Sequence, residues 1–160
     1  MKFLGNHTPE NFFSTFWEKE AYYIHDAIDI PKDAVKKSDL LDMVSDEYFE
    51  TRLIEDNSSK ISVTDGPISI GSFEELKGKW TIMVHNLNLY NEFALKLEKI
   101  VEFVPKWLFD DVMWSYSNKG SKKNAHIDNY SVFILQVTGQ RKWLIENEPD
   151  KTFKEEQDLK

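Results

Sequence analysis

The sequence predicts an α+β domain in which helices come first and an antiparallel sheet follows. Residues 91–104 carry apolar side chains at helical spacing, whereas short apolar runs alternate with polar turns from residue 111 onward. The chain has 160 residues, of which 41% are hydrophobic and 14% aromatic, enough to build the core of one domain. Helices followed by antiparallel strands are typical of a sheet that closes into a barrel or sandwich.

The first predicted helix begins at Thr8. Thr8 supplies an N-cap hydroxyl, Pro9 fits the first turn, and Glu10 lies near the positive end of the helix dipole. The aromatic residues that follow share one helical face, and we interpret them as core packing: Phe12, Phe13, Phe16 and Trp17. Residues 21–25 then predict a short strand.

Ser38 is the predicted N-cap of a second helix, whose apolar face carries Leu40 and Val44. Residues 50–54 and 61–63 predict the two strands of a hairpin, because a polar turn separates them. After these strands the sequence predicts a short helix over 72–77 that ends at Gly78, a strand over 80–87 and the helix over 91–104 that ends before Pro105.

The last third of the chain has the pattern of β structure. Residues 111–117 predict a strand, and residues 118–124 form a polar loop. Residues 126–137 and 141–145 predict a hairpin with a Thr-Gly-Gln turn between them. The charged residues 148–160 predict a loop or a frayed end.

Composition excludes several classes of function. A net charge of −8 argues against a nucleic-acid binder that uses a basic surface. The chain contains no cysteine, which excludes disulfides, cysteine-ligated zinc, iron–sulfur clusters and thiol nucleophiles. The N-terminus lacks the apolar run of a signal peptide, and no stretch is apolar enough to span a membrane. We therefore expect a cytoplasmic protein.

His126 and Asp128 form the strongest candidate site. Residues two apart on a strand point to the same face, so these two side chains would project together. One imidazole and one carboxylate are two of the three protein ligands of a non-haem Fe(II) site. The alternative is a surface histidine near the end of a hairpin. His85 is the one plausible third ligand in the chain, although a strand histidine with a hydrogen-bond partner is the commoner explanation.

An iron site of this kind usually holds an oxo acid, whose far carboxylate needs a cation. Arg141 lies on the predicted partner strand and can bind a carboxylate through two hydrogen bonds, so we prefer it to Lys142. Ser117 could add a hydroxyl to the same carboxylate. The alternatives are a solvated hairpin arginine and a strand-end serine that bonds its own backbone. Asp110 and Asp111 would face opposite ways on a strand, so we read them as strand-start residues and not as a catalytic pair.

Residues 109–117 and 126–143 strongly resemble the JmjC-type cupin ribosomal oxygenases. The match is best with the bacterial group that hydroxylates an arginine of a large-subunit ribosomal protein. It extends over residues 11–145 and has no gap from Asp110 to Trp143. The resemblance implies a double-stranded β-helix core, Fe(II), 2-oxoglutarate and O2. It further implies a ribosomal protein as substrate and a homodimeric full-length form. The bacterial relatives favour arginine as the target and the eukaryotic ones suggest histidine. The net charge leads us to expect no direct contact with nucleic acid.

By position, the resemblance makes His126 and Asp128 metal ligands and makes Arg141 and Ser117 the residues that bind 2-oxoglutarate. Residues 1–108 correspond to the N-terminal helical and strand part of the JmjC domain. Residues 109–160 correspond to the first strands of the cupin core.

The family's third ligand is a histidine some tens of residues further on. We therefore expect this chain to be the N-terminal portion of such a hydroxylase or a shortened relative with an incomplete core, and to have little activity by itself. The alternatives are a truncated, non-catalytic cupin-like binding module and a metal-dependent cupin of another reaction class. Arg141 together with Ser117 favours the oxo-acid enzyme over another class of cupin.

Overall fold

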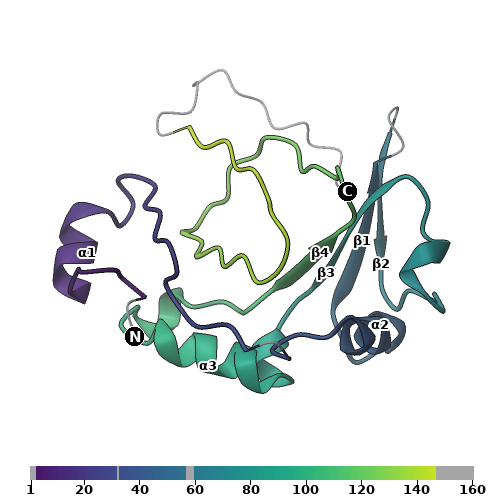
Figure 1. Cartoon of the computed structure of the whole chain (residues 1–160), viewed down its shortest axis with the longest axis horizontal. Coiled ribbons are helices and arrows are strands. Elements are labelled where there is room, and N and C mark those ends of the chain that lie inside the picture. Colours follow the sequence, from purple (N-terminus) through teal and green to yellow (C-terminus); the bar gives the residue numbers. More distant parts are fainter. Residues whose placement is uncertain (1–2, 32, 57–59, 147–160) are drawn as a thin grey trace. The chain divides into compact units, whose positions relative to one another are not determined.

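A four-stranded antiparallel sheet is the main element of the structure (Figure 1). The computed structural model describes residues 3–31, 33–56 and 60–146. These residues divide into two units, which we describe separately. The first contains residues 3–31 and 125–146, and the second contains residues 33–56 and 60–124.

The sheet belongs to the second unit and has the strand order β2-β1-β3-β4. Each strand is antiparallel to its neighbours. The strands are β1 (Thr51–Asp56), β2 (Ile61–Asp65), β3 (Lys79–Val84) and β4 (Trp114–Ser117). The β1–β2 hairpin confirms the predicted pairing of residues 50–54 with 61–63.

The described residues contain three α-helices and three short 3-10 helices. The α-helices are α1 (Pro9–Thr15), α2 (Lys37–Ser45) and α3 (Glu92–Ile100). The 3-10 helices are η1 (Phe73–Glu75), η2 (Leu87–Leu89) and η3 (Lys106–Leu108). Within this part of the chain, no helix has both the length and the apolar character needed to cross a membrane.

The main core lies between α2 and one face of the sheet. Leu40 and Val44 of α2 and Ile82 and Val84 of β3 have no solvent-exposed surface. Burying an aliphatic side chain of this size contributes about 1.5–3 kcal/mol to folding. Successive side chains of a strand point to opposite faces, so Thr81 faces away from α2. Figure 1 shows α2 lying beside β1 in this arrangement.

Capping explains where two of the helices begin. The Thr8 hydroxyl accepts a hydrogen bond from the Asn11 amide at 3.3 Å, which confirms the predicted start of α1. Asn91 accepts bonds from the amides of Phe93 and Ala94 at 2.9 and 3.0 Å and so caps α3. The prediction for α2 was wrong by two positions. Ser38 lies inside that helix, where its hydroxyl donates to Asp39 Oδ1 at 3.0 Å.

The α+β class is confirmed, but several predicted strands are shorter or absent. Strand β3 ends at Val84 and not at residue 87, because Asn86 adopts a left-handed conformation with φ 55°. Strand β4 begins at Trp114, since the preceding segment is bonded to the turn after β3. The predicted short helix over 72–77 is the shorter 3-10 turn η1, which ends at Glu75 and not at Gly78.

Residues 21–25, 126–137 and 141–145 form no strand in the described structure, so these three predictions were wrong. A strand needs a neighbour that accepts and donates its backbone hydrogen bonds. No strand of the described residues pairs with these segments. Most of the apolar side chains in residues 126–145 are exposed as a result. The prediction for residues 148–160 falls outside the described residues.

An aromatic cluster organises the first unit. The Phe133 ring lies with its centroid 5.4 Å from that of Phe3, 6.1 Å from Phe12 and 6.0 Å from Trp17. Phe12 is buried, in agreement with the packing role predicted for the aromatic stripe of α1. Phe133 therefore packs the segment that carries His126 and Asp128 against Phe12 of α1.

Candidate functional site

His126 and Asp128 lie together, as predicted, although no strand holds them. His126 Nε2 is 3.6 Å from Asp128 Oδ2, and the two side chains are 31% and 44% exposed. Two atoms that each bind one metal ion at about 2.1 Å lie at most about 4.2 Å apart. Two ligands at right angles around one ion lie about 3.0 Å apart, so the nitrogen and the oxygen reach neighbouring positions after a movement of about 0.6 Å.

A third ligand is not found in the part of the chain that the structure describes. No three histidine, aspartate or glutamate side chains gather there into a group that could hold a metal ion. His85, the candidate from sequence, is occupied by a different contact. Its Nδ1 lies 3.4 Å from Asp111 Oδ2. The hydrogen-bonded strand-end histidine is therefore the better interpretation of His85.

The pair of His85 and Asp111 perturbs both pKa values. The hydrogen bond to Asp111 raises the pKa of His85 above its ordinary value, against the opposing effect of burial. The same bond lowers the pKa of Asp111, and the Asn86 amide, which donates to Asp111 Oδ2 at 2.9 Å, lowers it further. His85 Nε2 is buried without a hydrogen-bond partner among the described residues. Asp110 is exposed, so the two adjacent aspartates are not a catalytic pair.

Ser117 ends β4 on the sheet face opposite α2. Its hydroxyl oxygen lies 2.8 Å from the hydroxyl oxygen of Thr81, and either group can be the donor. The two residues are direct cross-strand partners on β3 and β4. Both are half-buried. A carboxylate approaching Ser117 would therefore meet a hydroxyl that a neighbouring strand already orients.

The polar loop after Ser117 folds back onto the start of β3. The Trp80 amide donates to Asn118 Oδ1 at 3.1 Å and to Ser121 Oγ at 3.0 Å. Asn118 also donates from its side-chain amide to the Gly78 carbonyl at 2.8 Å. These bonds fix the chain immediately beyond Ser117, so the end of β4 has a defined position on the sheet.

Arg141 is exposed, and its guanidinium carbon lies 6.0 Å from the centroid of the Trp143 ring. That distance suits a cation–π contact. No strand forms at residues 141–145 to direct the Arg141 side chain. Arg141 belongs to the first unit and Ser117 to the second.

Thr81 is the residue at this site that the sequence did not single out. It stands between Trp80 and Ile82, two core residues, so strand alternation already placed its side chain on the other face. The sequence could not show that this face is the one shared with Ser117, because that depends on the register between β3 and β4.

Comparison with known proteins assigns the fold to a class. Residues 96–160 match the family model of the JmjC domain. The structure of YcfD, a ribosomal oxygenase from Escherichia coli, in complex with cobalt and succinic acid superposes with a TM-score of 0.63 at 22% identity, over 72% of this chain and 32% of that one. The complex of YcfD with cobalt and 2-oxoglutarate gives a TM-score of 0.62 at 21% identity, with the same coverage. The chain therefore has the fold of part of a JmjC cupin protein.

Two curated proteins are similar to this chain over most of its length. A probable ribosomal oxygenase of Haemophilus influenzae is 30% identical over 141 residues, which are 86% of this chain and 34% of that protein. The ribosomal protein uL16 3-hydroxylase of Escherichia coli is 27% identical over 136 residues, which are 84% of this chain and 36% of that protein. The chain is thus similar to these two proteins and spans about a third of their length.

Proposed function

We propose that this protein is an Fe(II)- and 2-oxoglutarate-dependent hydroxylase of a ribosomal protein side chain, with arginine as the favoured target. The observation that carries the proposal is the separation of 3.6 Å between His126 Nε2 and Asp128 Oδ2, which suits two ligands of one ion. Homology to the ribosomal oxygenases supports the substrate class. The complex of a structural relative with cobalt and 2-oxoglutarate supports the cofactor class.

Each side chain has a stated role in this proposal. His126 and Asp128 would hold the metal through a nitrogen and a carboxylate oxygen. Arg141 would bind the far carboxylate of 2-oxoglutarate with its two-pronged guanidinium, and Ser117 would donate its hydroxyl to the same carboxylate. The bound iron would supply the activation of O2, with 2-oxoglutarate oxidised to succinate and CO2 while one oxygen atom enters a C–H bond of the substrate.

The test is succinate formation coupled to modification of a ribosomal peptide. We expect the protein expressed from its complete reading frame to form succinate and to raise the mass of the peptide by one oxygen atom. The substitutions His126→Ala and Asp128→Ala should each abolish both signals, because one remaining ligand cannot keep the metal in place.

His25 and Asp26 provide a matched control. They form an exposed histidine–aspartate pair 2.7 Å apart in the same unit, so His25→Ala removes the same chemical group from the same kind of surface pair. We expect this variant to keep full activity. Turnover that survives both His126→Ala and Asp128→Ala would contradict the site, and a wild-type protein that leaves 2-oxoglutarate unchanged would contradict the function.

A further inference from the structure

The hydroxyl groups of Thr81 and Ser117 form a cross-strand pair at the end of β4. Their oxygen atoms are 2.8 Å apart, within the usual range of a hydrogen bond between hydroxyls. The register places the two residues directly opposite each other on β3 and β4. Residues opposite each other in antiparallel strands present their side chains on the same face. The register between β3 and β4 thus accounts for the contact between the two hydroxyl groups.

The direction of this hydrogen bond decides what Ser117 can offer a ligand. A serine hydroxyl has one proton to donate and two lone pairs that accept. A carboxylate can only accept, so Ser117 must direct its proton at the carboxylate to bind it. That arrangement requires Thr81 to be the donor in the pair, with Ser117 Oγ as acceptor.

We propose that Thr81 is a positioning residue for 2-oxoglutarate, which donates to Ser117 Oγ and thereby directs the Ser117 proton toward the far carboxylate of the oxo acid. The inference rests on the function proposed above and adds a residue to its cosubstrate site. Two hydroxyls in series polarise each other, so the serine becomes a better donor than it would be alone.

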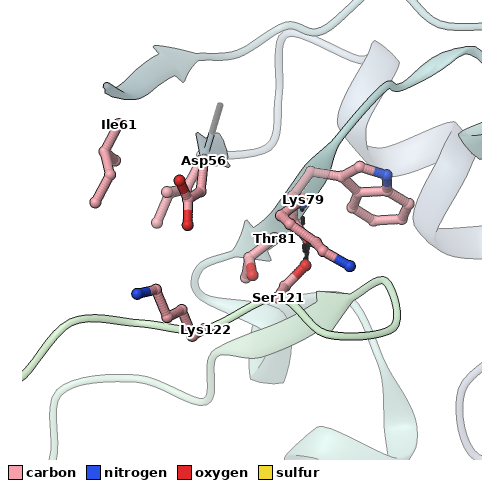
Figure 2. A pocket seen from close by; sticks show the side chains of 8 residues that line it. Asp56, Ile61, Lys79, Thr81, Ser121 and Lys122 are labelled. Carbon is pink, nitrogen blue, oxygen red and sulfur yellow. Dashed lines mark hydrogen bonds between the residues drawn. The ribbon is translucent and has the colours of Figure 1, made fainter. Parts of the chain in front are cut away.

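The surroundings of Thr81 suit this task. A β-branched side chain has few rotamers, and a strand position is more rigid than a loop position. Thr81 is also half-buried, which strengthens a hydrogen bond relative to one in water. Thr81 lines a depression of about 220 Å³, open solvent included, together with Asp56 and Ser121 (Figure 2). Thr81 therefore lies beside open space and not within a closed core.

Kinetics of Thr81→Val test the proposal, because valine keeps the shape and the β-branch and removes only the hydroxyl. We expect the KM for 2-oxoglutarate to rise about two- to tenfold, which corresponds to the net loss of one hydrogen bond, while kcat changes less than twofold. Thr81→Ser should restore the wild-type KM. In a Ser117→Ala background, Thr81→Val should add no further increase. Thr64→Val, at an exposed position of β2, is the matched control and should leave KM unchanged.

Two results would overturn the proposal while the function stands. One is a wild-type KM in Thr81→Val, and the other is a set of independent, multiplicative effects of Thr81→Val and Ser117→Ala. A wild-type protein that does not consume 2-oxoglutarate would instead overturn the function and this inference with it. Thermal unfolding of each variant separates a loss of folding from a loss of binding, since a misfolded variant would lose kcat as well as affinity.

Discussion

The imidazole of His85 and the carboxylate of Asp111 join the turn that follows β3 to the segment that leads into β4, with Nδ1 and Oδ2 3.4 Å apart. Both side chains are mostly buried, at 24% and 18% exposure. The Asn86 amide donates to the same carboxylate, and the Leu87 amide donates to the Val112 carbonyl at 2.8 Å. The pair therefore belongs to a network that sets where β4 begins.

The first prediction is that this pair makes stability depend on pH. Folding raises the pKa of His85 from 6.5, so its contribution is complete below about pH 6.5 and is lost as the pH rises through the raised value. Folding lowers the pKa of Asp111 from 3.8, so its contribution is present above about pH 3.8 and is lost as the pH falls through the lowered value. The pair should stabilise most between these limits.

Urea unfolding of wild type and His85→Gln measures this effect. We expect the variant to lose about 1 kcal/mol of unfolding free energy near pH 5.5, and a smaller amount near pH 9, where the wild-type histidine becomes neutral. His25→Gln is the control, since the exposed pair of His25 with Asp26 should contribute less than about 0.5 kcal/mol. An equal loss for His85→Gln at both pH values would show that packing, and not charge, accounts for it.

The second prediction concerns the tight approach of Gly66 to Thr51. A Cβ atom on Gly66 would lie 1.9 Å from Thr51 Oγ1, and Thr51 is 3% exposed. The Gly66 amide also donates to the Thr51 carbonyl at 2.8 Å, so the two backbones cannot separate freely. We expect Gly66→Ala to destabilise the fold by roughly 1–3 kcal/mol, as measured by urea unfolding.

Thr51→Ala provides the matching rescue. Thr51 Oγ1 is buried and has no hydrogen-bond partner among the described residues, so removing it alone should cost less than about 1 kcal/mol. The double variant Gly66→Ala, Thr51→Ala should recover most of the stability lost in Gly66→Ala, because the clashing oxygen is gone. Additive losses in the double variant would mean that backbone strain, and not this contact, limits residue 66.

The third prediction tests the cap of α3. Asn91 Oδ1 accepts from the amides of Phe93 and Ala94, which would otherwise lack partners at the start of the helix. Asn91→Ala should lower the unfolding free energy by about 1 kcal/mol. Asn91→Asp keeps the accepting oxygen and should stay within about 0.5 kcal/mol of wild type. Equal losses in both variants would contradict the capping role.

The sequence correctly predicted the elements that depend on interactions between residues close in the chain. The start of α1 at Thr8, the hairpin of β1 with β2 and the apolar face of α3 each follow from capping or from side-chain periodicity. Predictions failed where the answer depends on a distant partner. Residues 126–137 have the composition of a strand, but a strand forms only beside another, and no pattern within the segment reveals whether a neighbour is present.

At the candidate site, too, contacts between neighbours in the sequence were predictable and contacts between distant residues were not. The meeting of His126 with Asp128 was predicted from strand alternation, and the two side chains do lie together although no strand forms there. The partner of His85 was not predictable, because Asp111 lies 26 positions away and reaches it through the pairing of β3 with β4. The sequence did not point to Thr81 either, because its proposed role depends on the strand register that places it opposite Ser117.

The last prediction concerns the anchor of the segment that carries His126 and Asp128. Phe133 is the residue of that segment that contacts the aromatic rings of Phe3, Phe12 and Trp17. Phe133→Ala should release residues 125–146 from α1, because aromatic contacts of this kind contribute about 0.5–1.5 kcal/mol each beyond the area they bury. Amide hydrogen exchange read by mass spectrometry should then be faster across the segment. Leu144→Ala is the control: Leu144 is 86% exposed, so the exchange rates should not change. Equal exchange in the two variants would mean that the backbone, and not Phe133, holds His126 and Asp128 in place.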